Sequence, residues 1–201
     1  MSTVGILAYG SLIEDPGKEI KPLIIEWVND IETPFPVEFA RSSKSRGGAP
    51  TLIPIEGGNL VKAVILVLEQ SVSVSDAKDF IWRRETRNED TKKKYDPPLN
   101  PGPNHIIVEE LSSLGGIDNI LYTKIGSNIK LLTPDHLADL AICSARGHAG
   151  EKMKDGINYL LSVKRQKIVT PLSDEYEKSI LKKTGTSSLE EAFTCICNGY
   201  A

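Results

Sequence analysis

The chain has 201 residues, of which 40% are hydrophobic and 25% are charged, as is ordinary for a globular protein. The formal net charge of −3 argues against a nucleic-acid-binding protein, because such proteins usually present a basic surface. No stretch approaches the ~20 apolar residues of a membrane span, and three cysteines are too few for a disulfide framework. We therefore expect a cytoplasmic protein, with residues 1–201 folded as a single domain.

The first two thirds of the chain are predicted to contain short strands. Residues 4–8 are an apolar run closed by Gly10, which is typical of a buried strand that ends in a tight turn. The other predicted strands are residues 34–40, 51–55 and 60–68, with Gly57-Gly58 as a hairpin between the last two, and residues 106–111 and 120–125 around the turn Gly115-Gly116.

One helix is predicted among the strands, at residues 73–87, and the C-terminal third is predicted to be helical. Thr133 can cap a helix that begins at Pro134, and Gly147 is a plausible end for it. Later helices are predicted at residues 152–164, 174–183 and 189–193, the last with a capping box from Ser187 to Glu190.

This order of elements favours an α+β fold, because the strands come first and most helices follow. Many short strands with glycine turns suit a small, mostly antiparallel β-barrel with flanking helices. Residues 96–104 contain four prolines and are predicted to be a surface loop. We expect residues 91–104 to form a mobile rim over a cavity entrance.

The first candidate for chemistry is the sequence Tyr9, Gly10, Ser11, Leu12, Ile13 at the end of the first strand. A strand followed by Gly and Ser can expose consecutive backbone N–H groups, which form an anion-binding concavity. The glycine spacing and the lysine of a phosphate-binding loop are absent, and Ser11 does not lie in a nucleophile elbow. A simple tight turn also explains this sequence.

The second candidate is Glu85. With about 100° per residue, it falls on the same stripe of the predicted helix as three apolar residues, Val74, Ala77 and Ile81. A carboxylate at a core-facing position must be paired with a cation or perform a function that needs it there. Arg84 and Arg87 are available as structural partners, so both interpretations remain open.

Together these sequences resemble the γ-glutamyl cyclotransferases, and most closely their ChaC branch, which acts on glutathione. Tyr9-Gly10-Ser11-Leu12-Ile13, followed by Pro16-Gly17, is similar to the substrate loop of that branch, and Arg84-Glu85 resembles its Arg-Glu pair. Residues 145–150 (ARGHAG) and 158–160 (NYL) resemble its later motifs. The charged, proline-rich residues 86–104 depart from the family, which usually moves quickly into a strand.

The resemblance implies a small β-barrel with flanking helices and an enzyme that releases 5-oxoproline from a γ-glutamyl amide. It implies Glu85 as the catalytic base, Tyr9, Gly10, Ser11, Leu12 and Ile13 as the substrate-binding loop, and no metal or organic cofactor. The expected partner is a small γ-glutamyl substrate, with no nucleic acid or membrane. The alternative is a non-catalytic binding protein of the same fold for γ-glutamyl or carboxylate ligands.

Other candidates have simpler explanations. The three histidines lack metal-ligand spacing, and Cys195 and Cys197 are expected to lie on one side of a strand and to serve in packing. The loop at residues 42–48, with Arg41 and Arg46, either lines the site and meets a substrate carboxylate or is simply solvated.

Overall fold

The computed structural model of the chain describes residues 2–199, which divide into two compact units. The first unit comprises residues 2–34 and 62–126, and the second comprises residues 35–61 and 127–199. The fold is of the mixed α+β class, as predicted, and the helical C-terminal third is confirmed. None of the described helices is both long and apolar enough to cross a membrane.

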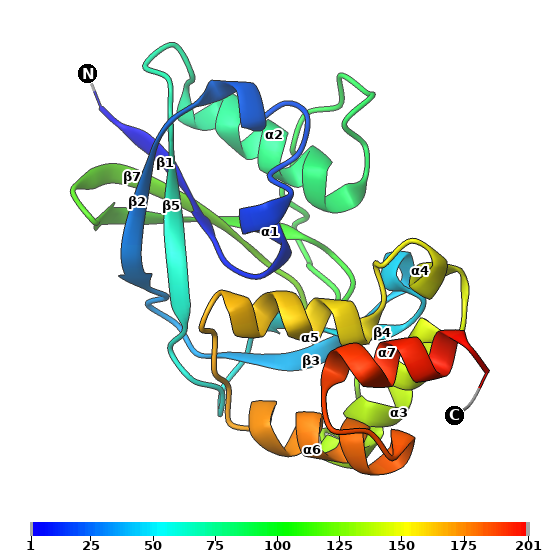
Figure 1. Ribbon diagram of the computed structural model, residues 1–201. Coiled ribbons are helices and arrows are strands. Elements are labelled where there is room, and N and C mark those ends of the chain that lie inside the picture. Colours follow the sequence, from blue (N-terminus) through cyan, green and yellow to red (C-terminus); the bar gives the residue numbers. More distant parts are fainter. Residues whose placement is uncertain (1, 200–201) are drawn as a thin grey trace. The chain divides into compact units, whose positions relative to one another are not determined.

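The first unit is built on a five-stranded sheet with the order β2-β5-β1-β7-β6 (Figure 1). Strand β1 runs parallel to β7, and the other neighbouring strands are antiparallel. The strands are β1 (Val4–Ala8), β2 (Ile24–Glu32), β5 (Lys62–Leu68), β6 (Ile107–Leu114) and β7 (Ile117–Lys124). The predicted strand at residues 4–8 and the predicted turn at Gly115-Gly116 are therefore confirmed.

The described strands do not close into the barrel that the sequence led us to expect. Strands β2 and β6 are the two edges of an open sheet. The turn between β6 and β7 nevertheless approaches β5 and β2, because a Cβ added at Gly115 would lie 2.9 Å from Ile65 Cδ1 of β5 and 3.0 Å from Ile31 Cδ1 of β2. Two irregularities in the pairing of β2 with β5 accompany this approach, and such bulges bend a strand and increase its twist.

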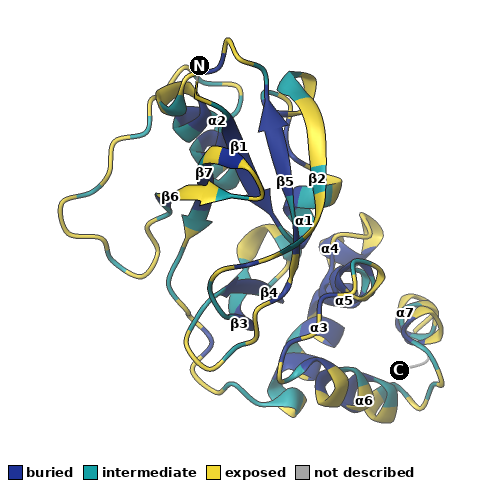
Figure 2. Cartoon of the chain, turned by 90° about the vertical axis from the view of Figure 1, so that its left-hand side faces the viewer, coloured by how far each residue is buried: buried dark blue, intermediate teal, exposed yellow. Residues whose placement is uncertain are grey.

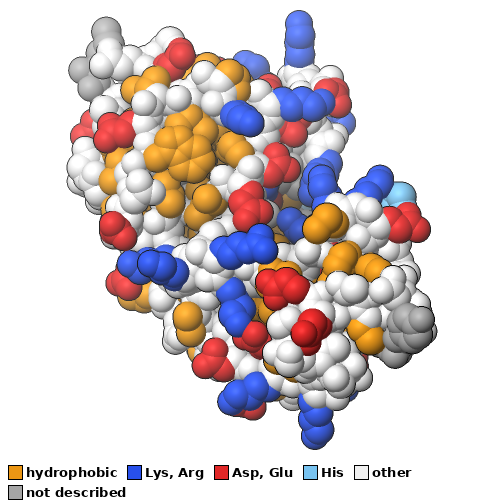
Figure 3. Space-filling view, viewed as in Figure 1, with side chains coloured by type: hydrophobic (Ala, Val, Ile, Leu, Met, Phe, Trp, Pro, Cys, Tyr) orange, Lys and Arg blue, Asp and Glu red, His pale blue; other side chains and the backbone are white. Residues whose placement is uncertain are grey.

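Strand β2 is the element that the sequence pattern failed to predict. It is largely exposed, and its apolar residues point both inward and outward, so the alternation that marks a half-buried strand is missing. Ile25 and Trp27 are 60% and 43% exposed. Figure 2 shows β2 as mostly exposed beside the buried strands β5 and β1, and Figure 3 shows hydrophobic side chains gathered on that part of the surface.

Helix α2 (Val74–Thr86) covers one face of the sheet and confirms the helix predicted at residues 73–87. Ser73 caps it, because its hydroxyl accepts a hydrogen bond of 3.1 Å from the Asp76 amide. The helix ends at Arg87, whose φ of 59° is left-handed. The core beneath α2 consists of Val4, Ile6, Ala8, Leu12, Ile20, Leu66, Leu68, Val72, Ala77, Ile81, Val108 and Leu121.

The second unit joins a two-stranded sheet to a group of helices. Strands β3 (Val37–Ser43) and β4 (Ala49–Pro54) are antiparallel, and the short helix η2 (Lys44–Arg46) connects them. The helices are α3 (Pro134–Ala145), α4 (His148–Glu151), α5 (Gly156–Arg165), α6 (Ser173–Thr184) and α7 (Leu189–Cys197). Thr133 caps α3 as predicted, with its hydroxyl 3.4 Å from the His136 amide.

The predicted hairpin at Gly57 and Gly58 is wrong, because β4 and β5 belong to different sheets. Asn59 instead pairs with Val37 at the start of β3, through N–H···O bonds of 2.8 and 3.2 Å. A Cβ added at Gly58 would lie 2.4 Å from the Val37 carbonyl oxygen. The glycine pair therefore permits a close approach to β3 and does not join two neighbouring strands.

The last helix also differs from the prediction. Helix α7 continues to Cys197, so Cys195 and Cys197 lie on a helix and not on a strand. Its cap is one residue later than expected, because the Ser188 hydroxyl accepts a 3.2 Å hydrogen bond from the Glu191 amide. The Glu191 carboxylate accepts a 2.9 Å bond from the amide of Ser187, the residue before the cap.

A buried tyrosine in the second unit lacks a polar partner. Tyr176 of α6 is fully buried, and its ring packs edge-on against Phe39 with 5.3 Å between the centroids. Within the described residues, the Tyr176 hydroxyl has no hydrogen-bond partner. Burial raises the pKa of Tyr176 above its ordinary value of 10.0.

Tyr176→Phe is therefore expected to be neutral or stabilising at pH 7, by up to about 1 kcal/mol, because it removes an unsatisfied hydroxyl. Above pH 10 the unfolded tyrosine loses its proton while the folded one keeps it, so this group lowers the stability of the wild type as the pH rises. Urea unfolding from pH 7 to pH 11 should show a smaller alkaline loss in the variant. A loss above about 2 kcal/mol at pH 7 would contradict the absence of a partner.

Candidate functional site

The predicted substrate loop forms a sharp turn directly after β1. Gly10 has φ 58° and ψ −131°, a conformation that favours glycine, and the short helix α1 (Ser11–Glu14) follows it. The Gly10 carbonyl accepts a 3.3 Å hydrogen bond from the Ile13 amide. Leu12 is buried in the core of the first unit, whereas Ser11 on the same turn is partly exposed. The turn is thus anchored by an apolar residue and keeps polar groups at the surface.

Glu85 lies in the last turn of α2. The apolar stripe that contains it is confirmed for Ala77 and Ile81, which are fully buried. Its side chain is 26% exposed, one residue before α2 ends at Thr86. The carboxylate is therefore partly shielded from solvent.

Arg84 brings these two predicted features together. Its Nε and Nη2 donate hydrogen bonds of 3.0 and 2.6 Å to the Asp15 carbonyl at the end of α1. Nη2 also lies 3.2 Å from the Ser11 carbonyl oxygen and 3.5 Å from the Ser11 hydroxyl. Nη1 forms an ion pair with the Glu85 carboxylate. The Arg84 guanidinium thus lies between the Glu85 carboxylate and the Ser11–Glu14 turn and contacts both.

The chain that follows α1 is tied to α2 by further contacts. The Lys18 amide donates a 2.6 Å hydrogen bond to the Glu89 carboxylate, just beyond α2. Arg83 donates two bonds of 2.8 Å to the Glu19 carboxylate, a partly buried pair. The hydrogen bond to Glu19 raises the pKa of Arg83. No local pattern indicates Glu89 or Glu19, because their partners are distant along the chain.

The predicted loop at residues 91–104 is confirmed as irregular chain, and its first residues are bound to α2. The Lys93 carbonyl accepts a 2.6 Å bond from Arg83 Nη1, and the Tyr95 amide donates one of 2.6 Å to Asp79. Beyond Tyr95 the loop is largely exposed, and Leu99 is 98% exposed. The Pro103 carbonyl nevertheless accepts a 3.0 Å hydrogen bond from the Gly126 amide, and the expected mobility of residues 91–104 stays a prediction.

The other predicted lining residues belong to the second unit. Burial lowers the pKa of Arg41 on β3. The Arg46 guanidinium lies 4.7 Å from the centroid of the Tyr159 ring, and its Nη1 donates a 3.3 Å bond to the Lys154 carbonyl. These contacts give Arg46 a packing role within its own unit.

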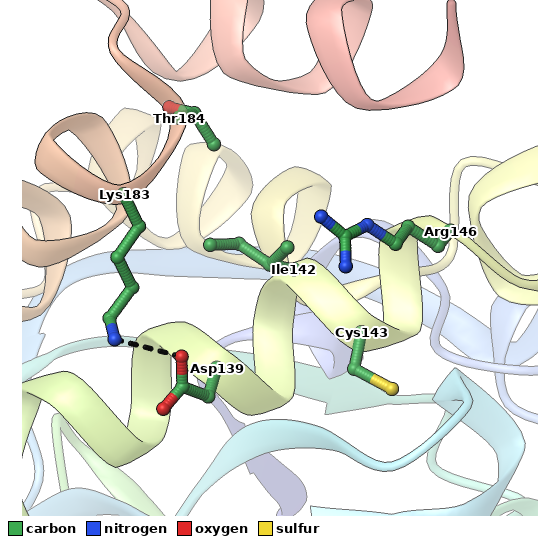
Figure 4. A pocket seen from close by; sticks show the side chains of 6 residues that line it. All are labelled: Asp139, Ile142, Cys143, Arg146, Lys183 and Thr184. Atoms are coloured by element: carbon green, nitrogen blue, oxygen red, sulfur yellow. Dashed lines mark ion pairs between the residues drawn. The ribbon is translucent and has the colours of Figure 1, made fainter. Parts of the chain in front are cut away.

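The second unit also contains a cavity of about 350 Å³, which Asp139, Ile142, Cys143, Arg146, Lys183 and Thr184 line (Figure 4). Lys183 Nζ lies 2.9 Å from the Asp139 carboxylate, and this hydrogen-bonded contact raises the pKa of Lys183. In Figure 4 the Arg146 guanidinium reaches toward Ile142, while the Cys143 sulfur points away from Thr184. None of the residues predicted for the site contributes to this cavity.

Across residues 2–199, His, Cys, Asp and Glu side chains nowhere gather in a group of three or more that could hold a metal ion. Neither a protein-family model, nor a curated protein, nor a solved structure matches this chain.

Gly17 is expected to be required for the turn after α1. Its φ is +93°, and an added Cβ would lie 2.4 Å from Glu89 Oε1 and 2.8 Å from Arg84 Cγ. Gly17→Ala should cost about 1–3 kcal/mol of stability, measured by urea unfolding. The matched control is Gly116→Ala, where φ is +81° and nothing lies within 4 Å of the added Cβ. Equal losses at both positions would refute the role of the contact with Arg84 and Glu89.

Proposed function

We propose that the protein is a γ-glutamyl cyclotransferase, which converts a γ-glutamyl amide to 5-oxoproline and a free amine, with Glu85 as general acid and base. The observation that carries the proposal is the Arg84 guanidinium, which contacts both the Glu85 carboxylate and the backbone of the Ser11–Glu14 turn. The two features that resemble the family are separated by more than 70 residues in the sequence, yet they meet around one side chain.

The reaction suits a site that holds one carboxylate beside one loop. The substrate's α-amino nitrogen attacks its own γ-carbonyl carbon, so a C–N bond closes a five-membered ring and the original amide C–N bond breaks. Because the attack is intramolecular, the site needs only to hold the substrate folded. The backbone amides of the loop are proposed to bind the substrate's α-carboxylate, since consecutive N–H groups suit an anion.

Two protons must move during this reaction. The substrate ammonium, with a pKa of about 8, must lose a proton before its nitrogen can attack. The leaving amine must gain a proton as the amide bond breaks. Glu85 is proposed to accept two protons in turn from the attacking nitrogen, one before the attack and one as the ring closes, and to pass each to the leaving amine, which departs as an ammonium ion. The reaction then needs neither a metal nor an organic cofactor.

The ion pair between Arg84 and Glu85 also bears on this proposal. Neighbours at i and i+1 do not face each other on a helix, so the side chains of such a pair must bend to meet. Here the meeting point is the edge of the Ser11–Glu14 turn, where the Arg84 guanidinium is bound by the Asp15 carbonyl. We propose that the first unit is an open variant of the family's small barrel, in which the β6–β7 turn lies against side chains of β5 and β2 near Gly115.

The alternative function is a binding protein that uses the same groups without catalysis. The pairing of Glu85 with Arg84 is the observation that favours a binding function. A carboxylate that is already paired with a cation can bind a substrate ammonium without accepting its proton. Detection of 5-oxoproline by mass spectrometry, from a panel of γ-glutamyl compounds, separates the two functions.

Glu85→Gln is expected to lower kcat by about 10²–10⁴-fold, because the amide keeps the shape of the side chain but cannot accept a proton. Binding of 5-oxoproline, measured by calorimetry, should survive. The matched control is Glu26→Gln, an exposed carboxylate on β2, which should leave kcat unchanged. Normal turnover by the Glu85 variant would show that the base is another group.

We also predict a preference for leaving groups that carry a carboxylate, such as the Cys-Gly of glutathione. Lys92, Lys93 and Lys94 follow α2 in the same unit and are all exposed. An exposed ion pair contributes only about 0.2–1 kcal/mol, so the preference in kcat/KM should be about fivefold or less. The comparison uses glutathione, γ-glutamyl-alanine and a γ-glutamyl alkylamine. Faster turnover of the alkylamine would contradict the prediction and leave the role of Glu85 untouched.

A further inference from the structure

Every nitrogen of the Arg84 guanidinium is bound, and to groups from two separate parts of the chain. Nε and Nη2 bind the Asp15 carbonyl, Nη2 also contacts Ser11, and Nη1 pairs with Glu85. The side chain is only 12% exposed. Such a forked set of contacts fixes the plane of a guanidinium, which a lysine ammonium on a flexible stem cannot reproduce.

The preceding residue, Arg83, provides an internal comparison. Its side chain is 7% exposed and also holds a carboxylate, that of Glu19, in two hydrogen bonds of 2.8 Å. A third bond of 2.6 Å joins Arg83 Nη1 to the Lys93 carbonyl. Both arginines therefore tie α2 to other segments of the first unit, but only Arg84 contacts Glu85 and the turn after β1.

This difference has a consequence for the proposed reaction. A substrate bound to the loop must present its α-nitrogen to the Glu85 carboxylate, and a misplacement of about 1 Å can cost about 10²-fold in rate. Arg84 fixes that relation directly, because the same guanidinium contacts the backbone at Ser11 and Asp15 and the carboxylate of Glu85.

We infer that Arg84 is a positioning residue, which sets the Glu85 carboxylate relative to the substrate loop and does not itself react. The inference rests on the proposed cyclotransferase activity. It assigns to Arg84 an effect on kcat that exceeds its effect on KM, because a loosened base lowers the rate of proton transfer more than it weakens substrate binding. A purely structural ion pair would instead give Arg83 and Arg84 the same behaviour.

The test compares Arg84→Lys and Arg84→Met with Arg83→Lys and Arg83→Met. For each variant, kcat and KM are measured with glutathione or with the best γ-glutamyl substrate of the panel, and Tm is measured on the same sample. The Arg84 variants are expected to lose about 10–100-fold in kcat, with KM changed less than about threefold. The Arg83 variants should keep kcat within about twofold of the wild type. Their Tm should fall by about as much as the Tm of the corresponding Arg84 variants.

Two further measurements keep the test sharp. Hydrogen exchange of the amides at residues 11–15 should become faster in the Arg84 variants and stay unchanged in the Arg83 variants. In Arg84→Ala, added ethylguanidinium should restore part of the lost kcat, which a change in global stability would not explain. Should the Met variant fail to fold, Arg84→Lys still carries the comparison, because it keeps the charge and most of the stem.

The outcomes separate the inference from the proposed function. Active wild type with equal kcat values for the Arg84 and Arg83 variants would overturn the positioning role and leave the cyclotransferase proposal intact. A loss in the Arg84 variants that lies wholly in KM would also overturn it. A wild type that forms no 5-oxoproline from any γ-glutamyl compound would overturn the proposed function, and the inference with it.

Discussion

The candidate site depends on the contacts of the Arg84 guanidinium. It joins the turn that follows β1 to the last turn of α2, and both segments are fixed independently by the core of the first unit. Leu12 anchors the turn, while Ala77 and Ile81 anchor the helix. Because both sides are held by apolar burial, the polar contact between them does not have to maintain the fold and is available to set a geometry.

The residue at which α2 ends determines where the Glu85 carboxylate lies. The left-handed conformation of Arg87 ends the helix just after Glu85, so that carboxylate lies where the apolar stripe leaves the core. Glu85 is 26% exposed and pairs with Arg84, whose guanidinium contacts the turn after β1. The site thus arises from the end of a regular element, where backbone groups are accessible and the core no longer excludes polar atoms.

Several features of the first unit were predictable because they depend on local chemistry. The apolar run at residues 4–8, the glycine turn at Gly115-Gly116 and the helix predicted at residues 73–87 depend on residues close in the sequence, and all three are confirmed. The hairpin expected at Gly57-Gly58 is wrong because glycine pairs also serve close backbone approaches, here to Val37. Strand β2 was missed because its apolar residues do not alternate with polar ones, so the local pattern of a half-buried strand is absent.

The sequence by itself determined the α+β class, the helical C-terminal third, and Glu85 and the Tyr9–Ile13 sequence as the two candidates for chemistry. Only the tertiary structure decided that Arg84 lies between them, and that Glu19 and Glu89 hold the turn after α1. The physical reason is the distance along the chain over which each interaction acts. Periodicity and turn preferences act over a few residues, whereas a guanidinium chooses its acceptors by their arrangement in space, and the sequence does not contain that arrangement in readable form.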